Sequence, residues 1–221
     1  MTETSLHTSA SPRTKGRTDF YADFGKRLLD LALTIALAPV FLMALAPILA
    51  VVAFDRGPLF FAHTRVGRHG KPIRVLKIRS MVPDAEARLR AHLAADPEAA
   101  REWEDFRKLK NDPRITRIGR ILRATSLDEL PQIWNVLRGD MSWVGPRPIV
   151  TDELEKYGDA APVYLTLKPG ITGLWQVSGR NQESYEDRVA MDVLYSRIMS
   201  PLTDLKLVLK TVLVVLRKTG I

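Results

Sequence analysis

The chain has 221 residues, no cysteine and a formal net charge of +8. Its length limits it to one domain or one domain with tails, and the lack of cysteine excludes disulfides and thiolate metal sites. The four histidines are not spaced as zinc ligands, which disfavours a zinc enzyme, while the basic charge suits nucleic acid, anionic lipid headgroups or phosphorylated substrates.

Residues 1–19 are predicted to form a disordered basic tail. The segment is rich in serine, threonine and basic residues and contains no apolar run. A signal peptide is disfavoured, because its apolar core should directly follow a charged start.

Residues 20–54 contain a long apolar stretch, and no residue from Leu31 to Phe54 is charged. Such a stretch is long enough to span a bilayer, which requires about 20 residues. Pro39 and Pro47 lie inside it, and basic residues flank both of its ends, which favours the same side of the membrane for both ends. We therefore expect a helix broken at Ala38-Pro39 that forms a re-entrant hairpin in one leaflet. A single span and a buried soluble helix are the alternatives.

Residues 55–200 are predicted to form a compact cytosolic catalytic domain, mainly α-helical with a small β-hairpin. Strand-like residues 59–62 and 73–78, separated by turn residues, predict the hairpin. Segments 83–92 and 97–110 carry helix formers of mixed charge and are interpreted as surface helices. A further helix is expected from about Tyr185 to Ile198.

Four arginines recur every third residue before the central block of the chain, at Arg114, Arg117, Arg120 and Arg123. On a helix they form a basic stripe beside an apolar one. A solvated helix face is one explanation. A contact with phosphates or an anionic membrane surface is favoured, because few acidic residues are present to neutralise the stripe.

The block from Thr125 to Pro148 contains the adjacent carboxylates Asp128 and Glu129. Two neighbouring carboxylates can hold a hard cation such as Mg²⁺ while one of them attacks or takes a proton. Ser126 is a candidate N-cap for a helix from about residue 128 to 137 that ends at Gly139. Both carboxylates would then lie in the first turn, where the helix dipole favours anions.

The cations around this pair predict a phosphorylated substrate, because guanidinium groups match phosphate through bidentate hydrogen bonds. Arg147 is fixed between Pro146 and Pro148, which positions its side chain in advance. A structural ion pair with a nearby carboxylate is the alternative for Arg147. We assign phosphate binding to Lys77, Arg79, Arg123 and Arg147.

Residues 201–221 are predicted to form an amphipathic helix at the membrane interface. The segment is strongly apolar, with lysines interspersed, and is too short and too charged for a good span. The proposed fold is thus a compact domain anchored by an N-terminal re-entrant membrane helix and by interfacial amphipathic helices.

Ordered blocks along the chain occur at residues 26–30, 57–61, 65–67, 77–81, 110–116, 125–148, 168–173 and 179–181. Together they resemble the bacterial sugar transferases, the monotopic polyprenyl-phosphate phosphoglycosyl transferases, from about Lys26 to the C-terminus. This chain departs from the family pattern with Ala38 where serine is common, and with Ala62-His63 where Arg-Gln is common. For His63 a polar surface substitution is favoured over a catalytic base.

The resemblance implies an enzyme on the cytosolic face of the bacterial inner membrane. Such an enzyme transfers a hexose-1-phosphate, here of galactose or glucose, from a UDP-sugar to undecaprenyl phosphate. The products are undecaprenyl-diphosphate-sugar and UMP, and the step begins exopolysaccharide, capsule or O-antigen synthesis. Anionic membrane lipids are expected partners, and a homodimer is left open.

The resemblance also implies roles for individual residues. Asp128 is the nucleophile and forms a covalent aspartyl intermediate, and Mg²⁺ is the cofactor with Asp128 as a ligand. Glu129 is the second catalytic residue, either as a further metal ligand or in handling a proton. The expected substrate-binding residues are Gln176, Arg180 and Asn181.

Two rival functions come from other classes. A nucleic-acid-binding protein explains the basic charge but neither the apolar run nor the carboxylate pair, so no nucleic-acid partner is expected. A non-catalytic basic membrane-associated scaffold explains the apolar run but not the polar and glycine-rich turns around one site.

Overall fold

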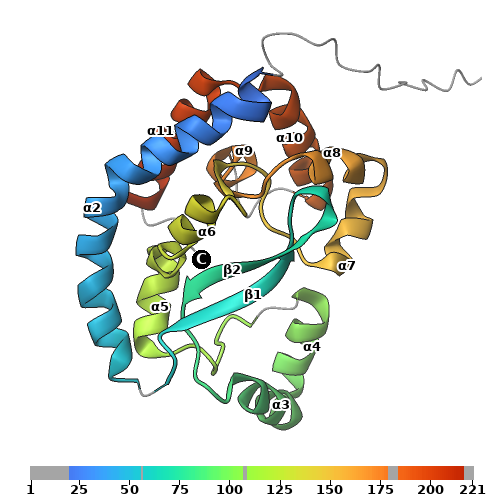
Figure 1. Cartoon of the computed structure of the whole chain (residues 1–221). Helices are drawn as coiled ribbons and strands as arrows, with labels where there is room; N and C mark the ends of the chain where they lie inside the picture. The colour runs from blue at the N-terminus through green and yellow to red at the C-terminus, as the bar shows by residue number, and fades with distance from the viewer. Residues whose placement is uncertain (1–19, 56, 107–108, 179–183, 217–221) are drawn as a thin grey trace, which may run out of the picture.

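The computed structural model describes residues 20–55, 57–106, 109–178 and 184–216. The described chain is mainly helical around two small sheets (Figure 1). Its helices are η1 (Tyr21–Gly25), α2 (Lys26–Ala53), η2 (Arg68–Gly70), α3 (Ala85–Ala95), α4 (Pro97–Phe106), α5 (Arg117–Ala124), η3 (Leu127–Glu129), α6 (Gln132–Arg138), α7 (Thr151–Leu154), η4 (Glu155–Ala160), α8 (Ala161–Thr166), α9 (Leu174–Ser178), α10 (Tyr185–Ile198) and α11 (Pro201–Leu216). Its strands are β1 (Phe60–Val66), β2 (Pro72–Ile78), β3 (Ser142–Val144) and β4 (Gly170–Thr172).

The predicted β-hairpin is confirmed, with a longer first strand than expected. Strands β1 and β2 pair in antiparallel fashion from Phe60 opposite Ile78 to Val66 opposite Pro72. The outer edge of β2 is bound by a side chain from α6: Asn135 Nδ2 donates to the Arg74 carbonyl at 2.8 Å, and the Leu76 N–H donates to Asn135 Oδ1 at 3.0 Å. Asn135 thereby fixes α6 against the hairpin.

A second sheet, not expected from the sequence, consists of the parallel strands β3 and β4. Two glycines, one directly after β3 and one at the start of β4, allow the two segments to cross. A Cβ on Gly145 would lie 2.2 Å from the Lys168 carbonyl oxygen, and a Cβ on Gly170 would lie 2.2 Å from the Gly145 nitrogen. The crossing therefore leaves no room for a side chain at either position.

Helix α2 corrects the expected break at Ala38-Pro39. The helix is hydrogen-bonded from Lys26 to Ala53 with Pro39 and Pro47 inside it. Each proline removes a helical hydrogen bond and bends the axis without ending the ladder on either side. Figure 1 shows the result as a bent helix along the edge of the domain.

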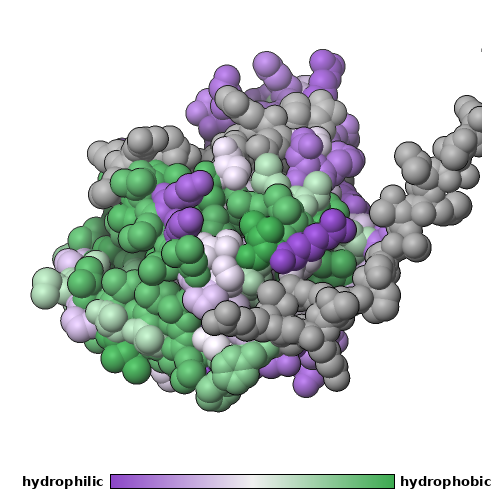
Figure 2. Space-filling model, turned by 90° about the horizontal axis from the view of Figure 1, so that it is seen from above, coloured by the Kyte–Doolittle hydropathy of each residue, from purple (hydrophilic) through white to green (hydrophobic). Residues whose placement is uncertain are grey.

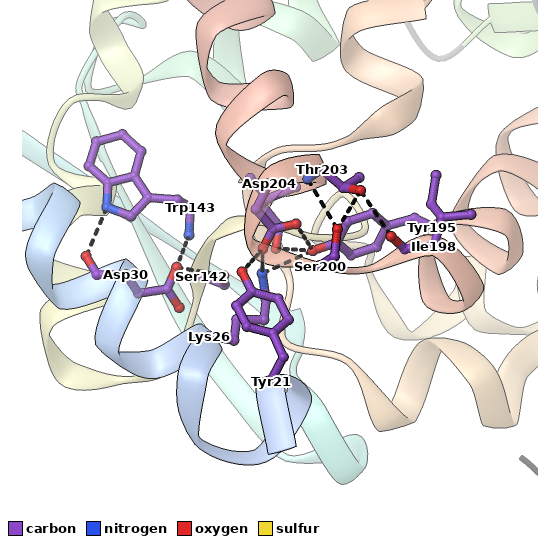
Figure 3. Close-up of polar contacts among 11 residues, drawn as sticks. Tyr21, Lys26, Asp30, Ser142, Trp143, Tyr195, Ile198, Ser200, Thr203 and Asp204 are labelled. Atoms are coloured by element: carbon purple, nitrogen blue, oxygen red, sulfur yellow. Dashed lines mark hydrogen bonds and ion pairs between the residues drawn. The ribbon is translucent and has the colours of Figure 1, made fainter. Parts of the chain in front are cut away.

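The first half of α2 is attached to the domain by polar contacts. Lys26, Asp30 and Thr34 are buried, and their spacing of four residues places them on one helix face. Lys26 Nζ donates to Asp204 Oδ2 at 2.6 Å, and Tyr195 on α10 donates to the other Asp204 oxygen at 2.8 Å (Figure 3).

The same face continues through Asp30 and Thr34. Asp30 Oδ1 accepts from Ser142 Oγ at 2.8 Å and from the Trp143 backbone N–H at 3.0 Å (Figure 3). The Trp143 indole N–H donates to Thr34 Oγ1 at 2.9 Å. These bonds join α2 to β3 and α11, so the helix is docked on the domain rather than extending away from it.

The other face of α2 is apolar and exposed, and α11 adds to it. By length and composition, the helix Tyr21–Ala53 is long and apolar enough to cross a membrane. Figure 2 shows a broad apolar area, interrupted by a few hydrophilic side chains, on the side of the molecule that carries these helices. Its exposed apolar residues on the two helices include Leu28, Ile35, Val40, Leu42, Met43, Val51, Leu202, Leu205, Leu209, Val212 and Leu213.

The remaining helices agree in part with the sequence analysis. Helix α10 has the predicted bounds, and α11 begins at the predicted Pro201. Helix α4 is described over Pro97–Phe106, and the described residues 109–110 are not helical. The arginine-rich helix α5 begins at Arg117, so Arg114 precedes it.

Candidate active site

A cavity of about 890 Å³ lies between the β-hairpin, the segment around α5 and η3, and helices α2, α9 and α11. One end of it is rich in cations and contains the carboxylate pair. The cationic lining residues are Arg65, Lys77, Lys110, Arg114, Arg120, Arg123 and Arg147. The other end is apolar and is formed by Leu37, Val40, Phe41 and Ala44 of α2 with Trp143, Ile171, Val208 and Val212.

The segment that carries the carboxylates differs from the expected helix. Ser126 has a left-handed backbone with φ 56° and makes no capping hydrogen bond, so it is not a side-chain N-cap. Asp128 and Glu129 lie in the short 3₁₀ helix η3, and α6 begins only after Pro131. The dipole argument for this position is correspondingly weakened, because the segment contains a single turn. The predicted end at Gly139 is confirmed, with φ 85°.

Asp128 and Glu129 both face Lys77 of β2. Lys77 Nζ donates to Glu129 Oε1 at 2.8 Å and lies 3.9 Å from Asp128 Oδ2. Asp128 is only 7% exposed. Burial raises the pKa of the Asp128 carboxyl above its ordinary value, and Lys77 opposes this shift by favouring the charged form. The fold thus brings the Asp128 carboxylate and the Lys77 ammonium together in the cavity.

Arg147 reaches the cavity from the crossing of the glycine-containing segments. It follows Gly145 and Pro146, and its guanidinium carbon lies 5.9 Å from the centre of the Trp175 ring. Because Gly145 and Gly170 approach without side chains, the backbone of this segment has little freedom. The pre-positioning of Arg147 by Pro146 and Pro148 stays a prediction, to which the close approach at Gly145 adds a further constraint on the backbone.

The other predicted phosphate ligands are placed differently. Arg123 lies in the last turn of α5 and lines the cavity. Arg79 is buried outside the cavity lining, beneath Gly57, where its Nη2 donates to the Val52 carbonyl at 3.4 Å. This contact attaches the end of α2 to the end of β2, so the structure gives Arg79 a place in the fold rather than among the cavity cations.

Among the predicted substrate-binding residues, Gln176 of α9 is buried and lines the cavity. Arg180 and Asn181 lie outside the described residues. His63 is exposed on β1 and pairs through Nδ1 with Arg65 Nη2 at 3.0 Å. Desolvation, together with Arg65 and Lys77, lowers the pKa of His63. It is not among the residues that line the cavity.

The donor set fits Mg²⁺ only together with a substrate. Within the described part of the chain no group of three histidine or carboxylate side chains could hold a metal. Mg²⁺ is usually held by one or two carboxylates together with substrate phosphates and water, which is the set that Asp128 and Glu129 can begin. The Lys77 ammonium contacts both carboxylates. Phosphate oxygens of a bound substrate could replace the carboxylates as its partners.

Several lining residues, Arg65 and Trp175 among them, were not predicted from the sequence, whereas Arg120 belongs to the predicted basic stripe. A signal for Arg65 exists in the hairpin, since side chains two apart share a face. Phe61 pairs with Lys77 and Arg65 pairs with Ile73, so Arg65 and Lys77 belong to the same face. The apolar end had no such signal, because it forms only when α2 and α11 pack together.

A model of the bacterial sugar transferase family matches residues 21–218. The chain belongs to the bacterial sugar transferase family.

Its relatives include an undecaprenyl-phosphate galactose phosphotransferase of Salmonella typhimurium, 50% identical over 197 residues, covering 89% of this chain and 41% of the relative. The exopolysaccharide production protein ExoY of Rhizobium meliloti is 48% identical over 192 residues, covering 85% of this chain and 83% of the relative. A UDP-glucose:undecaprenyl-phosphate glucose-1-phosphate transferase of Caulobacter vibrioides is 41% identical, covering 86% and 69%. The chain spans about two fifths of the length of several of the curated relatives that it matches.

Proposed function

We propose that this protein transfers a hexose-1-phosphate from a UDP-sugar to undecaprenyl phosphate, releasing UMP and forming undecaprenyl-diphosphate-sugar. The observation that carries this proposal is the cavity that joins a cationic end, with the buried Asp128, to an apolar end between α2 and α11. Phosphate groups suit the first end and an isoprenoid chain suits the second. The phosphates of donor and acceptor would therefore meet at Asp128.

The reaction proceeds in two displacement steps. An Asp128 oxygen attacks the phosphorus that bears the sugar, a bond forms from that oxygen to phosphorus, and the bond to the UMP oxygen breaks. UMP leaves with that electron pair. An oxygen of undecaprenyl phosphate then attacks the same phosphorus, which breaks the aspartyl bond and returns Asp128 as a carboxylate.

The other cavity residues act on charge and position. Lys77 keeps Asp128 in its charged form before attack and then faces the phosphoryl oxygens. Arg123 and Arg147 bind the diphosphate of the donor, since both line the cationic end. Glu129 holds Lys77 and, with Asp128, would hold Mg²⁺; when bound, the metal would neutralise phosphate charge.

The choice of sugar rests on the relatives. Their names specify galactose for the Salmonella protein and glucose for the Caulobacter protein, so we propose galactose or glucose for this chain. Exopolysaccharide synthesis is the proposed pathway, since the Rhizobium relative is named for it. The start of capsule or O-antigen synthesis belongs to the same proposal.

We further place the protein on the cytosolic face of the inner membrane, inserted in one leaflet. Both ends of α2 contact the same domain: Lys26 binds Asp204, and the Val52 carbonyl accepts from Arg79. A helix tied to one domain at both ends has its termini on one side, while its exposed apolar face contacts lipid.

A labelling experiment tests the function. The enzyme is incubated with Mg²⁺ and UDP-galactose or UDP-glucose radiolabelled in the sugar, without lipid acceptor. We expect stoichiometric UMP release and a labelled protein, with neither in Asp128→Asn, whereas Glu129→Gln should only slow the reaction. Later addition of undecaprenyl phosphate should move the label to lipid.

Two results contradict the proposal. Undiminished labelling of Asp128→Asn places the nucleophile elsewhere. Absence of transfer to lipid with either sugar, in protein that remains folded, favours a non-catalytic membrane scaffold.

A further inference from the structure

Trp175 has an unusual position among the aromatic residues of the cavity. Of the described lining residues, the other aromatic rings are Phe41 and Trp143, which pack on each other at 5.8 Å in the apolar end. The Trp175 ring instead lies beside the cations. It is partly exposed, and among the described residues its buried indole N–H has no hydrogen-bond acceptor. A buried indole N–H normally has a partner, so the lack of one here calls for an explanation.

Two guanidinium groups hold the Trp175 ring. The guanidinium carbon of Arg147 lies 5.9 Å from the ring centre, and that of Arg188 lies 5.3 Å from it. Arg188 is only 7% exposed, and its Nη1 lies 3.7 Å from a Glu153 oxygen. Its Nε and Nη2 have no hydrogen-bond partner in the part of the chain that the structure describes.

A buried guanidinium with unused donors is costly, so its place in the fold calls for a reason. Arg188 also contacts the Tyr185 ring at 5.1 Å, which fixes it between two aromatic residues. Held in this way, it keeps the indole in one orientation before any ligand arrives. A pre-positioned flat surface lowers the cost of ordering a ligand on it.

We propose that Trp175 is the surface on which the pyrimidine base of a nucleotide stacks, with Arg188 as a positioning residue behind it. This inference rests on the proposed function, in which the donor is a nucleoside diphosphate sugar. Arg147 lies 5.9 Å from the centre of this ring and lines the same cavity as the other cations, so it could bind the phosphate next to the nucleoside.

The chemistry around the ring favours a base over the hexose. Arg147, Arg188 and the indole N–H are all donors, and a uracil ring presents two carbonyl oxygens as acceptors together with a flat face. A hexose presents hydroxyls that donate as well as accept, and these three donors would leave the hydroxyl O–H groups without acceptors. Arginine and tryptophan planes are both surfaces on which bases stack.

Binding of UMP to the full-length protein tests this assignment without requiring turnover. Trp175→Leu removes the aromatic face and should weaken UMP binding by about 5- to 150-fold, the usual effect of losing one base–aromatic stack. Trp175→Phe keeps a face and should bind UMP within about threefold of wild type. Trp134→Leu, at an exposed tryptophan outside the cavity, is the control and should leave UMP affinity unchanged.

Two further ligands separate the base from the other parts of the donor. Pyrophosphate lacks the base, and hexose-1-phosphate carries only the sugar, so Trp175→Leu should bind both as wild type does. Equal weakening for pyrophosphate would instead make Trp175 a mere support for Arg147. Weakening for hexose-1-phosphate alone would make the ring a sugar platform. Either outcome overturns the assignment, as does wild-type UMP affinity in Trp175→Leu.

A fluorescence measurement covers the case in which Trp175→Leu does not fold. A base stacked on the indole should quench tryptophan emission on UMP addition to the wild type, and this quenching should be lost in Trp175→Phe although UMP still binds. Quenching that persists in Trp175→Phe contradicts the stack. Because neither measurement involves sugar transfer, this inference can fail while the proposed function stands, and the reverse also holds.

Discussion

The ammonium of Lys77 lies 3.9 Å from the buried carboxylate of Asp128, although the two residues belong to the hairpin and to the segment before α6. Removing the charge in Lys77→Met should lower UMP release about 100-fold, a typical effect of losing one charge-stabilising group in an active site. It should also move the acid limb of the pH–rate profile to higher pH, because Lys77 lowers the pKa of Asp128. The profile of kcat/KM measures both effects.

The matched control is Lys71→Met, at an exposed lysine just before β2. It should leave the rate and the profile unchanged. Loss of activity in Lys77→Met with an unmoved acid limb would show that Lys77 acts on the substrate alone and not on the ionisation of Asp128.

The charged Asp128 side chain should lower the free energy of unfolding of the protein. Its pKa is raised in the folded protein by burial, so the protonated form is favoured by folding and the charged form is disfavoured. The penalty is therefore absent at a pH below the unfolded pKa and appears as pH rises through the folded pKa. Asp128→Asn should have a higher Tm than wild type near pH 7 while losing activity, and each kcal/mol gained corresponds to about 2–4 °C.

This Tm difference should shrink as the pH is lowered towards about 4, the ordinary range for a carboxyl group. Asp152→Asn, at an exposed carboxylate in α7, serves as the control. A Tm difference for Asp128→Asn that is constant with pH would contradict the electrostatic explanation.

Gly145→Ala should damage both folding and the site. The new methyl would lie 2.2 Å from the Lys168 carbonyl, so one of the crossing segments has to move. We expect a loss of about 1–3 kcal/mol of stability, as is usual for overpacking. In protein that still folds, UMP release should fall because Arg147 is displaced. A variant with wild-type Tm and rate would show that the crossing is looser than the structure indicates.

The ion pair between Lys26 and Asp204 predicts that removing one of the two charges destabilises the protein more than removing both. Lys26→Met leaves Asp204 buried without its cation and should destabilise the protein by about 3–5 kcal/mol. The double variant Lys26→Met with Asp204→Asn should recover part of this loss, because no unpaired charge remains. Thermal unfolding in detergent measures the pair. A double variant with a Tm no higher than that of the single variant would argue against the ion pair as the cause.

The attachment of both ends of α2 to one domain predicts the membrane topology. The chain contains no cysteine, so single cysteines at the exposed Asp23 and Asp55 can be labelled individually. A membrane-impermeant thiol reagent should reach both from the cytosolic side and neither from the outer side of intact cells. Labelling of one position from the outer side would establish a full span.

Local patterns in the sequence were sufficient for elements whose signals lie within one segment. The bounds of α10 follow from the capping residue Ser184, whose side chain accepts from the Asp187 N–H, and the hairpin follows from strand alternation broken by turn residues. The end of α6 at Gly139 follows from its left-handed backbone. In each case the deciding interaction is close in the chain.

The features that sequence patterns did not reveal depend on partners far along the chain. The polar face of α2 is formed by residues whose partners are residues 142–143, 195 and 204, far along the chain. Without those partners, charges such as Lys26 appear only to flank a membrane segment. In the sequence, Arg79 cannot be told from the cations that line the cavity. Its contact with the Val52 carbonyl, far along the chain, places it outside the lining. Strands of three residues, such as β3 and β4, carry too little pattern to be detected.

Asn135 has a consequence for solubility as well as for catalysis. Its amide occupies the backbone groups of Arg74 and Leu76 that would otherwise form an open strand edge. Such an edge is a template for pairing with another chain, so this one side chain also protects against aggregation through β2. Because α6 follows directly after the carboxylate pair, losing Asn135 would expose the edge and shift Asp128 relative to Lys77. A single substitution here would thus produce a poorly soluble protein and an inactive one by the same structural event.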